Sequence, residues 1–190
     1  MRVFEGFGSL PGFRHAAVTV GSFDGVHLGH RALLERLTAE AEAAGGESIV
    51  MTFEPHPRIA LGRAEGLRLL TTLEEKIGLL EQSGVDNVIV IPFDRAFAAL
   101  SGRDFIERCI CGAAGAETLI AGYNHRFGHD RTGADEIEAS GLLRVVRVGE
   151  YRLDGQHVSS TVIRRLLDEG KTAEAERLLG RRNEELKMKN

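Results

Sequence analysis

The stretch "VTVGSFDGVHLGHRALLERL", residues 18–37, joins an apolar β-branched run to an amphipathic helix pattern through a turn with three glycines. Residues 16–20 (AAVTV) predict a buried strand, and residues 30–44 predict a helix because their apolar side chains recur at helical spacing. The apolar face of that helix consists of Leu33, Leu34, Leu37 and Ala41. A strand, a glycine turn and a helix in this order are typical of α/β proteins.

The same alternation of strands and helices continues along the chain. Further strands are predicted at residues 48–53, 87–91, 118–121 and 142–148. Helix starts are predicted at Thr71 with Glu74 or Thr72 with Glu75, at Ser101 with Asp104, and in two last segments that end at Gly170 and Gly180. Residues 54–70 and 122–136 are interpreted as loops. The sequence therefore predicts an open, mostly parallel sheet with helices on both faces, which gathers ligands at the carboxyl ends of its strands.

Composition excludes several classes of protein. The 190 residues are 43% apolar and 27% charged, and no apolar run approaches the roughly 20 residues of a membrane span. The net charge of −4 and the absence of a basic stripe with aromatic residues argue against a nucleic-acid partner. No leader pattern opens the sequence, so a cytoplasmic location is expected. Cys109 and Cys111 are expected to be apolar fillers of a helix, and nothing in the sequence indicates the oligomeric state.

The glycine turn matches neither of two common phosphate-binding signatures. Gly21, Gly25 and Gly29 are spaced four apart, whereas the dinucleotide fingerprint requires G-x-G-x-x-G. The "GKT" at residues 170–172 lacks the first glycine of a P-loop, because Arg165 stands at that position.

What remains in the turn is His27 and His30 at the start of a helix. Free N–H groups and the helix dipole favour an anion there, and imidazole adds directional donors that can stabilise a leaving pyrophosphate. One alternative is that the two histidines only cap the turn. Another is a zinc site made by His27, His30, His125 and His129, although no cysteine lies near them in the sequence.

A family resemblance rests on several motifs in order. "GSFDGVHLGHRALL" (21–34) resembles the HxGH signature of nucleotidyltransferases, in the form seen in the adenylyltransferase module of bacterial FAD synthetases. The resemblance covers residues 16–180 and includes "TFEPHPR" (52–58), residues 70–107, "GYNHRFG" (122–128) and "VSSTVIRRLLDEG" (158–170). It implies a Rossmann-like nucleotidyltransferase domain over residues 1–180. A riboflavin kinase module usually follows this domain in the family, but residues 181–190 read as a charged tail with no start of a second domain, so that module is expected to be absent. The sequence does not decide between a shortened chain and a protein that receives FMN from another enzyme.

The resemblance also implies a reaction and a set of site residues. The family transfers AMP from ATP to the phosphate of FMN, giving FAD and pyrophosphate with magnesium present. Catalysis would rest on His27, His30, Asn124 and Arg164. ATP would contact Gly21, Ser22, Phe23, Asp24, His27, Gly29, His30, Ser159, Ser160, Thr161 and Arg164. FMN would contact Phe53, Pro55, Pro57, Asn124, Arg126 and Phe127.

Some of these residues have competing interpretations from the sequence. The hydroxyls of residues 159–161 could form an ordinary helix cap, Phe53 could belong to the core, and Arg126 could be a solvated loop residue. His125 departs from the phenylalanine often found at its position in the family. No carboxylate cluster resembles a permanent metal cage, so Mg²⁺ is expected to arrive with ATP, with Asp24 and Asn124 as secondary ligands at most. Other interpretations of the function are an HxGH nucleotidyltransferase with a different phosphorylated acceptor, or a flavin- or ATP-binding module without catalysis.

Overall fold

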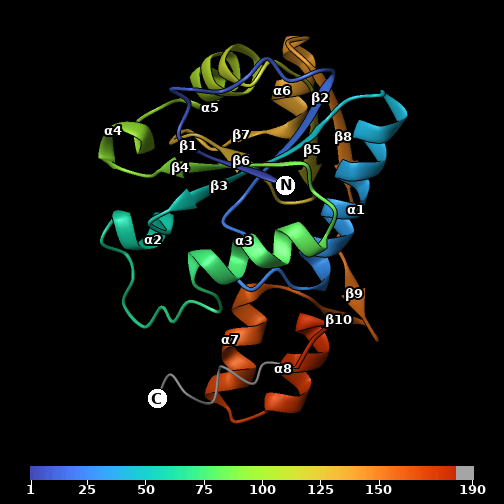
Figure 1. Cartoon of the computed structure of the whole chain (residues 1–190). Helices are drawn as coiled ribbons and strands as arrows, with labels where there is room; N and C mark the ends of the chain where they lie inside the picture. The colour runs from blue at the N-terminus through green and yellow to red at the C-terminus, as the bar shows by residue number, and fades with distance from the viewer. Residues whose placement is uncertain (183–190) are drawn as a thin grey trace.

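The structure is a computed structural model that describes residues 1–182. Six parallel strands form its central sheet (Figure 1), in the order β1-β4-β3-β2-β5-β8. These strands are β1 (Arg2–Glu5), β2 (Ala16–Val20), β3 (Ser48–Glu54), β4 (Asn87–Pro92), β5 (Ala116–Gly122) and β8 (Arg144–Val148). The α/β fold predicted from the sequence is confirmed.

Helices cover both faces of the sheet and bury its apolar side chains. On one face, α1 (Leu28–Ala43) and α3 (Leu73–Gln82) pack against the strands through a cluster that includes Leu34 and Leu80. On the other face lie α5 (Gly102–Asp104), the π-helix η1 (Phe105–Ala113) and α6 (Ala134–Ser140). Successive residues of β3 pack on opposite faces of the sheet, with Ile49 and Met51 in one cluster and Val50 in the other, as expected for a strand buried on both sides.

The strand order places one crevice at the centre of the sheet. The chain adds β3 and β4 on one side of β2, and then adds β5 and β8 on the other side. The order therefore reverses between β2 and β5, whose carboxyl ends are followed by residues 21–27 and 123–125. Open α/β sheets bind ligands at such a switch point, because the connections leave it in opposite directions.

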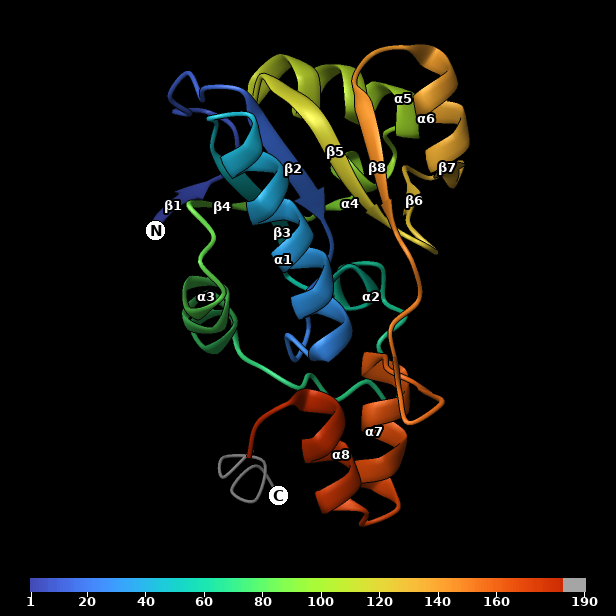
Figure 2. The same cartoon turned by 90° about the vertical axis from the view of Figure 1, so that its right-hand side faces the viewer.

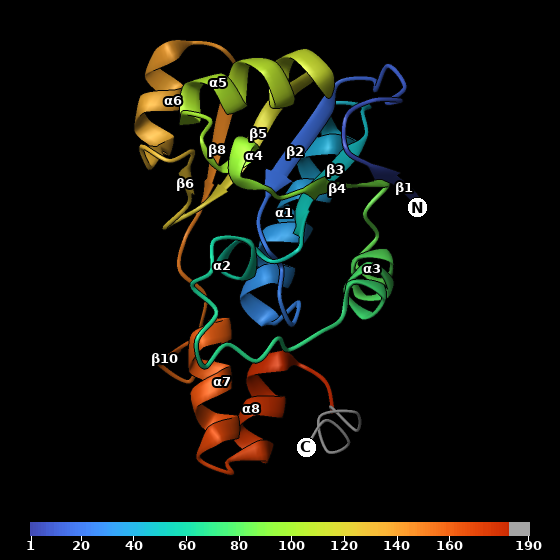
Figure 3. The same cartoon turned by 90° about the vertical axis from the view of Figure 1, so that its left-hand side faces the viewer.

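The last part of the described chain lies beyond the carboxyl ends of the strands. Helices α7 (Ser160–Asp168) and α8 (Thr172–Leu179) pack on each other there, below the lower end of α1 in Figure 2. The short helix α2 (Pro57–Ala60) lies between the sheet and α7 in the view of Figure 3. The remaining short elements are α4 (Arg95–Ala98), β6 (Arg126–Phe127), β7 (Thr132–Gly133), β9 (Arg152–Leu153) and β10 (Gln156–His157).

Most predicted elements are confirmed, with shifted ends. Of the two possible capping boxes, Thr72 with Glu75 forms: each side chain meets the backbone N–H of the other residue. The predicted helix from Ser101 begins as expected but continues as a π-helix, in which the Ala114 N–H reaches the Cys109 carbonyl at 3.1 Å.

The sequence analysis missed strand β1 and helix α6, as well as the short elements α2, α4, β6, β7, β9 and β10. Strand β1 is a short edge strand with little burial, and α6 begins within the last residues of the segment 122–136, which was interpreted as a loop. Residues 183–190 of the predicted tail lie outside the described residues, whereas Arg181 is half-buried and donates to the Val26 carbonyl at 3.5 Å. Within residues 1–182, no helix is both long and apolar enough to cross a membrane.

Candidate functional site

The turn that follows β2 has an unusual backbone. Phe23, Gly25 and Val26 have φ angles of 47°, 84° and 36°, in the left-handed region that side chains with a Cβ rarely adopt. Glycine accepts this conformation at no steric cost, but Phe23 and Val26 require support from the surrounding structure. Both are fully buried in the cluster beneath α1, which provides that support.

Asp24 fixes this turn to two other segments. Its Oδ1 accepts hydrogen bonds from the backbone N–H groups of Leu70 at 2.9 Å and Thr71 at 3.1 Å. Its other oxygen forms an ion pair with Arg164 of α7, and its backbone carbonyl accepts from the Ser160 hydroxyl at 2.9 Å. Asp24 is only 3% exposed, so these contacts satisfy a buried carboxylate and join the turn to the first turn of α7.

His27 and His30 lie at the amino end of α1 and contact each other directly. His27 is the N-cap, and its Nδ1 accepts the backbone N–H of His30 at 3.2 Å. The proton of a neutral His27 ring is therefore on Nε2. The two rings stack with centroids 3.6 Å apart, and the His30 ring also contacts Phe23 at 5.0 Å. A Cβ on Gly29 would lie 3.3 Å from both the His27 ring and the Val158 carbonyl, so this close packing favours glycine.

Burial keeps these rings neutral. It lowers the pKa of His27 to about 4, and burial together with neighbouring His27 lowers the pKa of His30 well below its ordinary value. Burial also lowers the pKa of His125 to about 4. The Nδ1 atoms of His30 and His125 have no hydrogen-bond partner among the described residues.

A polar cleft of about 330 Å³ opens beside these histidines. The amino ends of α1 and α7 both reach it, so two sets of helix N–H groups point toward the same space. Of the predicted ATP-binding and catalytic residues, its walls include Ser22, His27, Gly29, His30, Asn124, Ser159, Ser160, Thr161 and Arg164.

An aromatic pocket of about 690 Å³ adjoins the polar cleft. Five phenylalanines contribute to its wall and contact one another in sequence, with ring centroids 5.2 to 6.4 Å apart. These are Phe53, Phe93, Phe97, Phe105 and Phe127. Pro57, Asn124 and Arg126, which were predicted to contact FMN, also line it.

Four residues belong to both cavities: Ser22, His30, Asn124 and His125. They come from the turn after β2, the start of α1 and the segment after β5, which is the switch point of the sheet. Among the described residues, neither cavity is lined by an aspartate or a glutamate, whereas both are lined by arginine and histidine. The two connected spaces therefore suit anionic ligands, one of which carries a large planar group.

Comparison with known proteins identifies the family. A family model described as FAD synthetase matches residues 11–162. The chain belongs to the FAD synthetase family. The bifunctional riboflavin kinase/FMN adenylyltransferase of Escherichia coli (strain K12) is 37% identical over 174 residues, which cover 86% of this chain and 53% of the relative. A relative from Geobacillus thermodenitrificans (strain NG80-2), provisionally given the same bifunctional name, is 35% identical over 90% of this chain and 92% of its own length.

Solved structures agree with the fold. A crystal structure titled macrolide-efflux protein, from Streptococcus pneumoniae, matches with a TM-score of 0.84 and 27% identity, over 94% of this chain and 60% of that one. Pantothenate synthetase from Thermus thermophilus matches with a TM-score of 0.55 and 17% identity, over 95% of this chain and 81% of that one. The second likeness concerns the fold alone. The chain spans about half the length of the E. coli relative.

Three of the residues that the FAD synthetase resemblance placed at the site lie off the cavity walls. Phe23 and Asp24 are buried behind the polar cleft, where they support His30 and Arg164. Pro55 is exposed and lines neither cavity. We therefore assign Phe23 and Asp24 to positioning of the turn. Gly21, which was predicted to contact ATP, lines the aromatic pocket and not the polar cleft.

Several site residues were not found from the sequence. Phe93 and Phe97 line the aromatic pocket. The sequence signal that could have identified them is their position directly after the predicted strand at residues 87–91. Tyr123 and His157 line the polar cleft, with the Tyr123 hydroxyl 3.3 Å from the His157 ring nitrogen. His157 lies in β10, which forms a short hairpin with β9 that the sequence analysis did not predict.

The residues present do not form a metal cage. Among residues 1–182, no group of three or more histidine, cysteine, aspartate or glutamate side chains could hold an ion. Asp24 already uses both carboxylate oxygens within the protein. This geometry does not support the zinc alternative.

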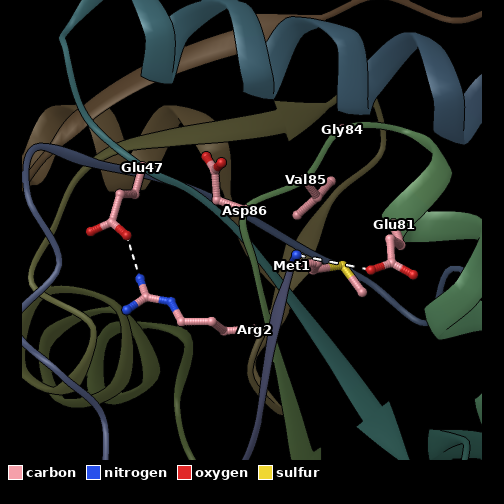
Figure 4. Close-up of a pocket in the computed structure, with 7 residues that line it drawn as sticks. All are labelled: Met1, Arg2, Glu47, Glu81, Gly84, Val85 and Asp86. Carbon is pink, nitrogen blue, oxygen red and sulfur yellow. Dashed lines mark hydrogen bonds and ion pairs between the residues drawn. The ribbon is translucent and has the colours of Figure 1, made fainter.

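A third cavity of about 530 Å³ lies at the opposite end of the sheet, where β1, β3 and β4 begin (Figure 4). Arg2 pairs with Glu47 across it, and the amino group of Met1 lies 3.9 Å from Glu81. Four of its charged groups thus form pairs, and Asp86 accepts hydrogen bonds from Ser48. None of the predicted site residues lies there.

Proposed function

We propose that this chain is an FMN adenylyltransferase, which transfers AMP from ATP to the phosphate of FMN and releases pyrophosphate. One observation carries the proposal: the polar cleft at two helix amino ends and the aromatic pocket with its five phenylalanines share the wall formed by Ser22, His30, Asn124 and His125. Membership of the FAD synthetase family supports the choice of the two substrates.

The polar cleft would hold the triphosphate of ATP. The Nε2–H of neutral His27, the ring of His30 and the Thr161 hydroxyl would donate to phosphate oxygens, while the Ser160 hydroxyl keeps its bond to the Asp24 carbonyl. Arg164 uses two of its donor groups on Asp24 and the Arg68 carbonyl, which fixes its guanidinium at the cleft wall with further N–H groups available. Mg²⁺ would enter with ATP as part of the substrate.

The aromatic pocket would hold the isoalloxazine ring of FMN, with the FMN phosphate directed to the shared wall. An oxygen of that phosphate then attacks the α-phosphorus of ATP. One P–O bond forms to FMN, the bond between the α-phosphorus and the bridging oxygen breaks, and pyrophosphate leaves with that oxygen. No phosphoryl group passes through the protein, so positioning and charge stabilisation account for the catalysis.

The test is direct. The purified chain is incubated with FMN, ATP and Mg²⁺, and the products are separated by chromatography for FAD and assayed for pyrophosphate. We expect both products in equal amounts. Phosphopantetheine, nicotinamide mononucleotide and a phospho-alcohol serve as alternative acceptors, and CTP and GTP as alternative donors. FMN binding without turnover would support a binding module, and turnover with another acceptor would replace the proposed substrate.

A further inference from the structure

Lys76 is a buried lysine outside both cavities. It lies on α3, is 6% exposed, and its Nζ donates to the Thr52 hydroxyl at 3.1 Å and to the Phe53 carbonyl at 3.5 Å. No carboxylate of residues 1–182 forms an ion pair with it. Glu54 and Asp24 act on it only through space, and burial lowers the pKa of Lys76 below its ordinary value.

An ammonium group in this position is costly for the fold. The free energy lost when an ammonium group leaves water is larger than the free energy gained from hydrogen bonds to two neutral acceptors. Buried charges are therefore normally paired with an opposite charge. A methionine of similar length would avoid that cost. Because no carboxylate of the described residues 1–182 pairs with this ammonium group, its location relative to the two cavities is informative.

The hydrogen bonds of Lys76 lead to the shared wall. Thr52 accepts from Lys76 and donates its own hydroxyl proton to the Ser22 carbonyl at 3.2 Å. Ser22 lines both the polar cleft and the aromatic pocket. The charge of Lys76 also contributes to the lowered pKa values of His30 and His56, both of which line the polar cleft. Lys76 therefore lies behind the wall on which the phosphates of the two substrates would meet.

We propose that Lys76 is a positioning residue for this site, which holds the Ser22 backbone through Thr52 and supplies buried positive charge for the phosphates at the shared wall. Its counter-ion is the bound substrate. In the free protein its charge is incompletely compensated, and binding of a polyphosphate restores the balance. This inference rests on the proposed function for the identity of the phosphates.

The first test compares Lys76→Met with Lys171→Met. Lys171 is half-exposed and pairs with Glu169 at the surface, so its substitution removes the same charge away from the site. Binding of magnesium pyrophosphate and of adenosine is measured by calorimetry, and stability by urea unfolding. We expect Lys76→Met to weaken pyrophosphate binding at least tenfold, to leave adenosine binding unchanged, and to unfold at no lower urea concentration than the original chain. Lys171→Met should match the original chain in all three measurements.

A merely structural role gives the opposite pattern. Lys76→Met would then lose stability, while its folded fraction would bind pyrophosphate as well as the Lys171→Met control. That result would overturn the inference. Because these measurements need neither FMN nor turnover, they remain decisive if the chain makes no FAD, an outcome that would remove the proposed function alone.

A second test uses the unaltered chain. The sequence contains four lysines, so ¹³Cε-lysine labelling gives few signals, and methionine variants at the other three assign Lys76 by elimination. We expect saturation with magnesium pyrophosphate to raise the pKa of Lys76 by at least one unit, a tenfold change in its proton affinity. A pKa that does not move at saturation contradicts the inference, whether or not the Lys76→Met variant folds.

Discussion

Arg164 and Asp24 form an ion pair across 140 positions of the sequence, with both side chains largely buried. Arg164 also donates to the Arg68 carbonyl at 2.7 Å, and Asp24 accepts from Leu70 and Thr71. The turn after β2, the segment before α3 and the start of α7 are thereby joined at one point. The polar cleft depends on this connection, because its two helix ends come from two of these segments.

Replacing Arg164 with Met should therefore impair both stability and activity. We expect the free energy of unfolding to fall by about 3 kcal/mol, because Asp24 stays buried without its partner, and kcat/KM for ATP to fall about a hundredfold. Arg165→Met is the matched control, since that neighbouring side chain is 64% exposed. In a double-mutant cycle, Asp24→Asn should cost much less in the Arg164→Met background than alone. Additive losses would show that the pair does not connect the segments.

His30→Ala should reduce kcat about a hundredfold or more, because one donor to the departing pyrophosphate is lost. The dissociation constant for FMN should stay nearly unchanged, since five phenylalanines line the aromatic pocket and remain in place. Steady-state kinetics and flavin fluorescence titration measure the two effects. His15→Ala, at an exposed histidine paired with Glu117, should behave like the original chain. An equal loss in FMN affinity and kcat, with the fold intact, would contradict the assigned role.

The aromatic pocket predicts a selective effect of Phe97→Ala. Phe97 contacts Phe53, Phe93 and Phe105, and its loss should raise KM for FMN about tenfold while KM for ATP is unchanged. Phe13→Ala is the control, because Phe13 packs against the same core cluster but lines neither cavity. The interpretation of the pocket is wrong if both variants change KM for FMN alike.

Stability should depend on pH through His27 and His125, whose pKa values are lowered from 6.5 to about 4 by burial. Above pH 6.5 both rings are neutral in the folded and unfolded chains. As the pH falls from 6.5 to 4, the unfolded chain takes up protons that the folded chain excludes, so the fold loses up to roughly 3 kcal/mol for each ring.

Urea unfolding at several pH values measures this loss, and His125→Gln should show a smaller decrease between pH 6.5 and 4 than the original chain. Carboxylates titrate in the same range in both proteins, so the difference between the two curves isolates the His125 ring. Parallel curves would mean that this ring titrates normally in the folded state.

Local patterns in the sequence were sufficient for most of the fold. The buried strand at Ala16–Val20, the Thr72–Glu75 capping box and the glycine ends of the last helices depend on residues within a few positions of each other. Strand β1 was missed because its pairing with β4 is a tertiary contact and its side chains are mostly exposed. The π-helix at Phe105–Ala113 has the same apolar pattern as an α-helix, so sequence spacing did not distinguish them.

The features of the site can likewise be separated into those set by local sequence and those set by tertiary contacts. The sequence by itself determined that His27 and His30 stand at a helix start, and that hydroxyls open the helix at Ser160, because caps and turns are local. Only the tertiary structure decided that these two helix ends share one cleft, and that Lys76, on the apolar side of α3 with Leu80, lies behind it. The physical reason is the order of strands: which carboxyl ends become neighbours depends on sheet pairing between distant segments, and local spacing does not specify that pairing.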